Sequence, residues 1–298
     1  MRIPLSVARA LVFLMSRPLG PPLPARLQRL WLEAVSTGGR LPKGTTVTRV
    51  DLGGRPAERV AAAGADAGRA VLLLHGGAFV IGSPRTHRVL AGHLSAAAGA
   101  PVFVLHYRRA PEHSFPAPVD DARAAYADLA AQGPTAVFGD SAGGCLALLL
   151  ALDLRDAGNP PPALALVSPV TDLTLAISDR YTGVDAVVRR DWLRSGARAF
   201  VGSADAAALS PLAAPLAGLP PVRVQVAGPE RLRAEGEELT TRLGEAGVDV
   251  DLEVLPRVWH DVHLLAHLVP EGAAAVAALG RWLGERLSDA DERDACAS

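Results

Sequence analysis

Short apolar runs with strand character recur along most of the chain. They occupy positions 71–74, 102–105, 136–138, 164–167, 222–226 and 249–255. Segments with helical patterns lie between most of them, at 86–98, 119–131, 143–156 and 235–246. Near-continuous apolar strands that alternate with helices are typical of a parallel sheet covered by helices on both faces. The pattern therefore predicts an α/β fold with a mostly parallel central sheet.

Two regions depart from this alternation near the start of the chain. Strand-like segments at 45–50 and 57–60 are joined by a Gly-Gly pair, which predicts an antiparallel hairpin. Residues 1–40 predict two helices around a proline-rich joint at 17–24. The apolar run in the first helix is interrupted by Arg9 and is too short to span a membrane, so we expect no signal peptide and a helix lying on the protein.

A third departure lies between Pro169 and Pro221, where a helical pattern at 191–200 is flanked by irregular sequence. An insertion late in an open sheet lies over the carboxyl ends of the strands, where ligands bind. We therefore expect one domain over 1–298, with a lid formed by about 1–40 and about 173–209. The polar tail after Leu287 is expected to be frayed.

Composition narrows the classes of protein. The chain has 298 residues, 49% of them hydrophobic, and a net charge of −1 from 30 basic and 31 acidic residues. No overall field therefore attracts nucleic acid or an anionic membrane, and we expect neither as a partner. Only two cysteines occur, Cys145 and Cys296, which form no disulfide framework and no metal-type spacing. A reducing, cytoplasmic location is expected.

A candidate nucleophile lies between a strand and a helix. Gly139-Asp-Ser-Ala-Gly143 matches G-x-S-x-G in the strand–turn–helix context of a nucleophile elbow. Glycines on either side of Ser141 allow close approach of strand and helix, which exposes the hydroxyl in a strained turn. The pentapeptide alone is a weak signal, because glycine and alanine are common in this chain, but two other segments support it.

The first supporting segment is His75-Gly-Gly-Ala-Phe79, directly after the strand at 71–74. Successive small residues after a strand let backbone N–H groups converge on one point, as an oxyanion hole requires. In elbow enzymes one donor comes from such a loop and another from the residue after the nucleophile. Gly76, Gly77 and Ala142 are therefore the expected oxyanion donors.

The second supporting segment follows the last strand and contains His260 and His263. A histidine after Ser141 in chain order, in a loop after a strand, can accept the serine proton, and His260 is our candidate, with His263 as its rival. Glu230 is the first acid after the strand at 222–226 and is expected to orient His260. Glu235 is more simply an N-terminal charge favourable to the next helix.

The sequence resembles the hormone-sensitive-lipase-like branch of α/β-hydrolases, a family of serine carboxylesterases, over nearly its whole length. The blocks that carry the match are 75–79, 107–113, 116–121, 139–144, 168–172 and 210–212, together with the His260 loop. The resemblance implies an α/β-hydrolase fold, a Ser141–His260–Glu230 triad, no metal or cofactor, and often a homodimer. It also assigns buried supporting positions near the elbow to Glu112 and Asp140.

Three departures from the family pattern stand out. The acid loop reads Glu230-Arg-Leu-Arg-Ala-Glu-Gly-Glu237, where the family usually has aspartate first. A register shifted by one would place Pro229 at the acid position and leave a Ser–His dyad. Ala78 replaces a glycine but retains its N–H, and Cys145 replaces an asparagine, which removes a polar contact behind the elbow.

Three function classes follow from these residues. The leading hypothesis is hydrolysis of a small carboxylic ester through an acyl-enzyme on Ser141, in an apolar pocket lined by Phe79, Trp192, Phe200 and Trp259. The second is a non-hydrolytic dehydratase or cyclase of natural-product metabolism on the same scaffold. The third is a receptor-like binding module, which the presence of His260 disfavours.

Overall fold

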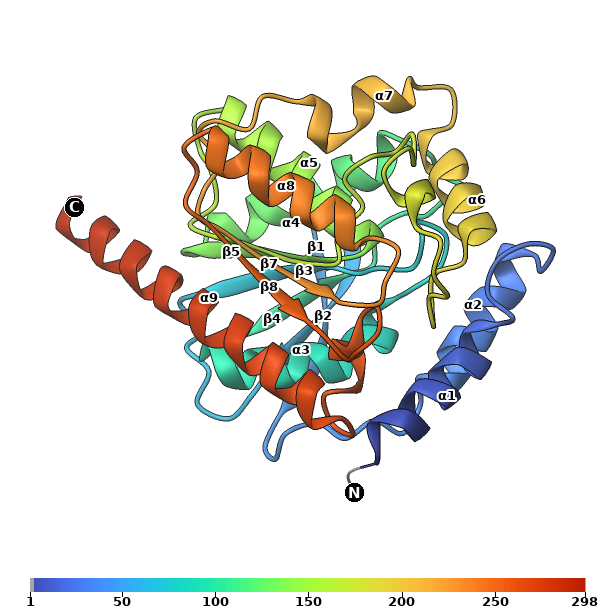
Figure 1. Cartoon of the computed structure of the whole chain (residues 1–298). Coiled ribbons are helices and arrows are strands. Elements are labelled where there is room, and N and C mark those ends of the chain that lie inside the picture. Colours follow the sequence, from blue (N-terminus) through green and yellow to red (C-terminus); the bar gives the residue numbers. More distant parts are fainter. Residues whose placement is uncertain (1–2, 298) are drawn as a thin grey trace.

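The computed structural model describes residues 3–297, and one eight-stranded sheet runs through it (Figure 1). The strand order is β1-β2-β4-β3-β5-β6-β7-β8. Neighbours from β4 to β8 are parallel, whereas β2 pairs antiparallel with both β1 and β4. The strands are β1 (Thr46–Leu52), β2 (Arg55–Ala61), β3 (Ala70–Leu74), β4 (Val102–Leu105), β5 (Thr135–Asp140), β6 (Leu164–Val167), β7 (Val222–Ala227) and β8 (Val250–Leu255). The predicted hairpin and parallel sheet are confirmed.

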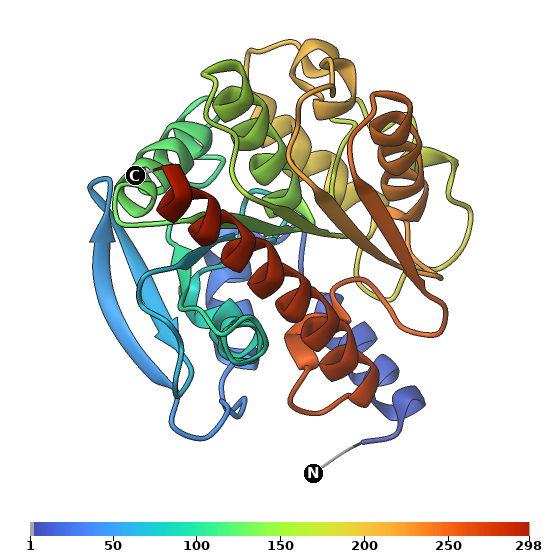
Figure 2. The ribbon, with the colours of Figure 1, turned by 90° about the vertical axis from the view of Figure 1, so that its left-hand side faces the viewer.

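Helices cover both faces of the sheet. One face carries α3 (Pro84–Ala98) and α9 (Pro270–Ala297), which pack against each other, as Figure 2 shows. The opposite face carries α4 (Ala117–Ala130), α5 (Ala142–Asp156) and α8 (Arg233–Glu245). The central strands β3, β5 and β6 are buried along their whole length, since both of their faces are covered. This explains why their sequences are continuous apolar runs rather than alternating ones.

The end of the chain differs from the expectation of a frayed tail after Leu287. Helix α9 continues to Ala297. Its apolar side packs into the core, against α3, through Val276, Leu279, Leu283 and Leu287. Beyond Leu287 the helix is held from outside by Arg69, whose guanidinium donates to Ser288 Oγ at 2.6 Å and pairs with Asp291 at 3.1 Å. A contact from a residue more than 200 positions away is not visible in the local pattern.

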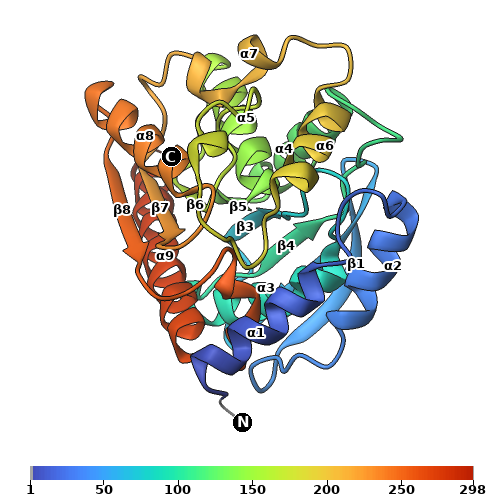
Figure 3. The same ribbon diagram turned by 45° about the vertical axis from the view of Figure 1, so that its right-hand side comes forward.

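A separate group of helices lies over the carboxyl ends of the strands. It consists of α1 (Leu5–Ser16), α2 (Ala25–Val35) and α6 (Arg190–Val201), with α7 (Ala206–Leu209) further along (Figure 3). Ser16 Oγ donates to the carbonyl of Ala186 at 2.8 Å. This bond joins α1 to the segment between Pro169 and Pro221, called the inserted segment below. The segments predicted as a lid are therefore in contact, although residues 1 and 2 of the first lie outside the described residues.

Arg29 of α2 ties this group to the body of the protein. Its guanidinium donates to the carbonyls of Val80 and Ala110, both at 2.8 Å, and pairs with Glu112 at 2.7 Å. The Glu112 side chain is 53% exposed, so the buried position implied by the resemblance is wrong. Glu112 instead accepts hydrogen bonds from Arg29 at the surface, beside α2.

The outer face of α1 and α2 is apolar and exposed. Its side chains include Val7, Leu14, Leu27, Leu30 and Trp31. Leu27, Leu30 and Trp31 of α2 thus point largely away from the core. Within residues 3–297, no helix is both long enough and apolar enough to cross a membrane.

Candidate active site

The candidate nucleophile lies in a strained turn at the end of β5. Ser141 has φ 53° and ψ −119°, outside the regions that L-residues ordinarily occupy. The strain persists because β6 and the loop after it hold the turn: the Ser141 N–H donates to Val167 O at 2.8 Å, and the Ser141 carbonyl accepts from Val170 N–H at 3.0 Å. Helix α5 begins at the next residue, so its N-terminus points at the serine.

The flanking glycines are required by contact with backbone. A Cβ at Gly139 would clash with the carbonyl of Gly143, and one at Gly143 would clash with the carbonyl of Leu74 on β3. Neither neighbour is the flexible end of a side chain. The steric reason inferred from the sequence is therefore present in the structure.

Gly143→Ala is expected to destabilise the protein by about 2–3 kcal/mol, because the added methyl overpacks a backbone-lined site. Gly244→Ala on α8 is the matched control, since a Cβ there meets open space and alanine favours a helix. Urea unfolding of both variants measures the difference. Equal free energies of unfolding for the two variants would contradict this account of the elbow.

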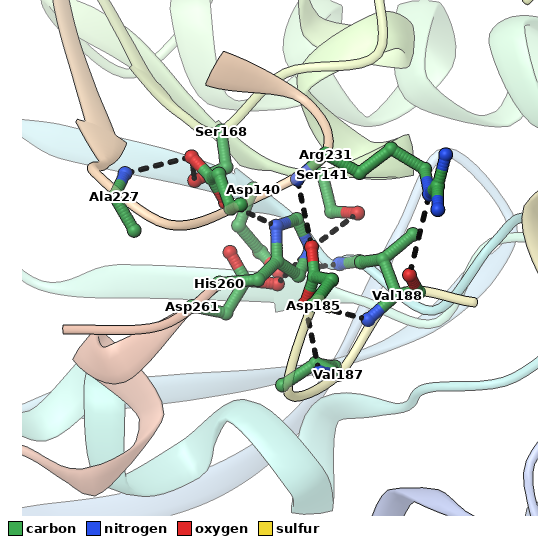
Figure 4. Close-up of polar contacts among 12 residues, drawn as sticks. Asp140, Ser141, Ser168, Asp185, Val187, Val188, Ala227, Arg231, His260 and Asp261 are labelled. Atoms are coloured by element: carbon green, nitrogen blue, oxygen red, sulfur yellow. Dashed lines mark hydrogen bonds and ion pairs between the residues drawn. The ribbon is translucent and has the colours of Figure 1, made fainter. Parts of the chain in front are cut away.

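His260 lies between the serine and the acid. Its Nε2 is 2.9 Å from Ser141 Oγ and its Nδ1 is 2.7 Å from Glu230 Oε2. All three side chains are buried, and they come from the ends of β5, β7 and β8. The structure thus brings the three predicted residues into one relay, in the register that places Glu230 rather than Pro229 at the acid position. Figure 4 shows Ser141 beside the His260 ring.

Glu230 is held by two further donors. Its Oε1 accepts from Ser168 Oγ at 2.8 Å and from the Ala227 N–H at 2.7 Å, which leaves Oε2 for the histidine. A carboxylate that accepts several hydrogen bonds is fixed in orientation. Both donors lie at strand ends, Ser168 after β6 and Ala227 at the end of β7.

The rival histidine has another partner. His263 Nε2 lies 2.7 Å from Gln225 Oε1, and burial lowers the pKa of His263 to about 4. His263 is therefore neutral and donates to Gln225 on β7. His260 and His263 are only three residues apart in the sequence, but the structure brings only His260 to Ser141.

The expected oxyanion donors divide into two groups. The Gly76 N–H donates to Asp140 Oδ2 at 3.0 Å, so it is not free to receive an oxyanion, and its assignment as a donor is corrected. The N–H groups of Gly77, Ala78 and Ala142 have no hydrogen-bond partner among residues 3–297. Ala78 takes the place expected for Gly76, which the sequence could have suggested because alanine retains its N–H.

Buried polar groups support the loop after β3. Asp140 accepts from the Gly76 N–H, and its Oδ2 lies 3.1 Å from His87 Nε2 on α3. Tyr107 donates to the carbonyl of His75 at 2.6 Å and its ring stacks on the imidazole at 4.2 Å. Burial lowers the pKa of His75 well below its ordinary value, so this imidazole is neutral. These contacts position the free N–H groups beside Ser141.

Glu235 has a different role from the one expected of a helix N-terminal charge. It is fully buried, and its Oε2 accepts from the N–H groups of Thr171 and Asp172 at 2.6 and 3.0 Å. Burial raises the pKa of Glu235 to about 7. The side chain therefore ties α8 to the loop that follows β6, beside the site. Its position in the first turn of a helix gave no sign of this.

A cavity of about 520 Å³ opens beside Ser141. Its wall comes from α1, α2, the inserted segment and the His260 loop, and its apolar lining includes Leu11, Val12, Leu32, Val188, Trp192, Trp259 and Leu265. Ser141, His260, Gly77 and Ala78 lie on its surface. This volume falls within the range of small-molecule sites.

Of the four aromatic residues expected in the pocket, Trp192 and Trp259 line the cavity, whereas Phe79 and Phe200 do not. Phe79 and Phe200 stack on each other with ring centroids 4.2 Å apart, and both are fully buried. Their expected role in the pocket is corrected: the pair packs α6 against the loop after β3. Sequence placed both near the site but could not say which way each ring points.

The inserted segment is also joined to the acid loop. Asp185 accepts from the backbone N–H groups of Val187 and Val188 and from the N–H of Arg231, which follows Glu230 (Figure 4). The Arg231 guanidinium returns to the inserted segment by donating to the Ser178 carbonyl at 3.1 Å. The cavity wall and the orienting acid are therefore parts of one hydrogen-bonded unit.

Comparison with known proteins identifies the family. Residues 71–264 match the model of a family described as having the alpha/beta hydrolase fold. The chain is 35% identical over 268 residues to the putative acetyl-hydrolase LipR of Mycobacterium tuberculosis (87% of each chain), and 40% identical over 254 residues to an acetyl-hydrolase of Streptomyces hygroscopicus (82% of this chain and 83% of the relative).

Solved structures agree. An esterase from the bacterial hormone-sensitive lipase family superimposes with a TM-score of 0.89 at 38% identity, covering 96% of this chain and 100% of that one. A mutant of the esterase E40 gives a TM-score of 0.90 at 38% identity, covering 95% and 98%. The chain belongs to the α/β hydrolase family and, within it, to the hormone-sensitive-lipase group of serine ester hydrolases.

Proposed function

We propose that the protein hydrolyses carboxylic esters that carry an apolar group, with Ser141 as nucleophile, His260 as general base and Glu230 as the acid that orients it. The observation that carries the proposal is the continuous relay of 2.9 and 2.7 Å from hydroxyl to imidazole to carboxylate, at the floor of an apolar cavity. The relatives named as esterases and acetyl-hydrolases support the same reaction class.

The reaction follows from the groups present. His260 Nε2 takes the proton of Ser141 as Oγ attacks the ester carbonyl, and Glu230 stabilises the imidazolium through Nδ1–H. The free N–H groups of Gly77, Ala78 and Ala142 receive the negative charge that develops on the carbonyl oxygen. The imidazolium then returns its proton to the leaving alcohol, and water attacks the acyl-enzyme with His260 as base.

The cavity suggests which esters are accepted. Two relatives are named for acetyl groups, but a 520 Å³ apolar cavity accommodates a larger group than acetyl. We infer that α1, α2 and the inserted segment act as a lid that covers this apolar part of the substrate. A homodimer and a cytoplasmic location remain predictions from the family resemblance and the cysteine content.

With p-nitrophenyl esters from acetate to laurate, kcat/KM is expected to rise about fourfold per methylene over the first few carbons, because each buried CH2 contributes about 0.8 kcal/mol. It should then fall once the cavity is full. Val12→Phe places a larger side chain in the cavity lining and leaves less room for the substrate. It is expected to shift the preferred acyl chain to a shorter length. Leu27→Phe on the exposed side of α2 is its control. A flat profile would contradict the proposed binding of the apolar group.

A further inference from the structure

Asp261 follows the candidate base directly and has no part in the relay described above. Its backbone is left-handed, with φ 56° and ψ 38°, a conformation that asparagine, aspartate and glycine accept most readily. The side chain is only 11% exposed and lies on the wall of the cavity. Oδ1 is buried without a hydrogen-bond partner among the described residues.

The other oxygen of Asp261 faces the atom on which the proposed mechanism depends. Asp261 Oδ2 is 3.1 Å from His260 Nε2, and Ser141 Oγ is 2.9 Å from the same nitrogen. His260 Nδ1 is already occupied by Glu230. Nε2 therefore has two oxygen neighbours. It carries either one proton or one lone pair, so it can form a hydrogen bond with only one of them at a time.

Only one of these arrangements allows catalysis. Ser141 is activated when Nε2 carries a lone pair that accepts its hydroxyl proton. An ionised Asp261 would then face that lone pair, which is unfavourable. A proton between Nε2 and Oδ2 removes the conflict, but it leaves Ser141 without a base. The two neighbours therefore compete for the same nitrogen.

The acids around this pair favour its protonated form. Besides Asp261, Glu230 from the loop after β7 acts on the imidazole of His260, and Asp140 from the end of β5 acts on Asp261. On the other side, His263 of η3 (Val262–Leu265) faces His260, and His87 of α3 faces Asp261. Figure 4 shows Asp140, Ser141 and Asp261 around the His260 ring.

The pKa values of both His260 and Asp261 reflect these neighbouring charges. Burial opposes a charge on His260, but Asp261 and then Glu230 outweigh it and hold the pKa of His260 well above its ordinary value. Burial raises the pKa of Asp261 to about 6; the charge of His260 opposes this rise and that of Asp140 adds to it. A proton held by this pair is therefore released at a higher pH than from an isolated imidazole.

We propose that Asp261 competes with Ser141 for Nε2 of His260 and thereby sets the pH below which the enzyme loses activity. The inference rests on the proposed function, in which His260 is the base. Below this pH the imidazolium is held against the Asp261 carboxylate, and Ser141 keeps its proton. As pH rises, that proton passes to solvent and Nε2 becomes free to accept from Ser141. Asp261 is a positioning residue, since it acts through His260.

The test is the pH profile of kcat/KM on p-nitrophenyl butyrate, whose acid limb reports the pKa of the base in the free enzyme. Asp261→Asn and Asp261→Gly both fit a left-handed backbone and remove the charge. Each is expected to move the acid limb to lower pH by about one unit, since a pKa shift of that size is common when a contacting charge is removed. Asp251→Asn, on β8 and 60% exposed, is the control that loses a charge away from the site.

The possible results distinguish failure of the competition by Asp261 from failure of the proposed ester hydrolysis. A purely structural role for Asp261 would lower the plateau rate and leave the limb in place, and an unmoved limb in both variants overturns the inference. Ser141→Ala should remain inactive in that case; if it keeps full activity, the proposed function itself fails. Should neither variant fold, ¹⁵N NMR titration of His260 in the unaltered protein decides, because a pKa at or below about 6.5 contradicts the competition.

Discussion

Ser141→Ala is expected to lower ester turnover by on the order of 10⁴ to 10⁶-fold with little change in stability. Removing the nucleophile of a serine hydrolase leaves only the contribution of the oxyanion donors and of binding, which accounts for the size of the loss. The serine lies at the floor of the cavity with its Oγ 2.9 Å from the base, and its backbone strain is set by the strands rather than by its side chain. Alanine therefore fits the same turn.

Steady-state rates on p-nitrophenyl butyrate, with urea unfolding of the same samples, provide the measurement. Ser168→Ala is an informative companion, since it removes one donor to Glu230 without touching the nucleophile. Its loss of rate should be far smaller. Ser141→Ala with more than a tenth of the normal rate would mean that another group performs the attack, and the relay would then have no catalytic role.

Glu230→Gln is expected to lower kcat by on the order of 10³ to 10⁴-fold. The amide removes the negative charge that stabilises the imidazolium and can present an N–H to Nδ1, which favours the wrong tautomer of His260. KM should change little, because Glu230 lies behind the histidine and is absent from the cavity wall. The split between kcat and KM distinguishes loss of orientation from loss of substrate binding.

Two controls sharpen the Glu230 experiment. Glu230→Asp keeps the charge but shortens the reach to a nitrogen now 2.7 Å away, so an intermediate rate is expected. Glu237→Gln removes a charge from the exposed side of α8, where Glu237 pairs with Arg233, and should leave the rate unchanged. If Glu230→Gln retains more than a tenth of the normal kcat, a Ser–His dyad is sufficient for the reaction.

Sequence predicted the sheet well because its physical basis is local. Each buried parallel strand requires a continuous apolar run, and each run is bounded by glycine, proline or polar residues. The relay could also be predicted, since the elbow, the acid loop and the histidine loop each follow a strand. Parallel strands bring such loops to one edge of the sheet.

What sequence could not predict depends on contacts between distant segments. The Gly76 N–H is occupied by Asp140 only because β5 ends beside the loop after β3. Phe79 turns away from the cavity because Phe200 stacks on it from α6. Glu235 reads as an ordinary helix N-terminal acid until the loop after β6 folds over it.

Asp261 illustrates the same limit at the site. Its position next to His260 is plain in the sequence, but adjacency along the chain does not place a carboxylate against Nε2. The left-handed backbone at Asp261 brings Oδ2 to within 3.1 Å of that nitrogen. Local φ and ψ therefore decide whether the aspartate is a solvent-facing loop residue or a neighbour of the base.

The most direct test of the central claim is covalent labelling with diethyl p-nitrophenyl phosphate, a reagent that phosphorylates activated serines. Intact-mass and peptide mass spectrometry should find one diethylphosphoryl group, on Ser141, with loss of ester turnover in step with labelling. Labelling should be absent in Ser141→Ala and strongly slowed in Glu230→Gln. A phosphoryl group on a different residue, or full turnover by a completely labelled Ser141, would contradict the account.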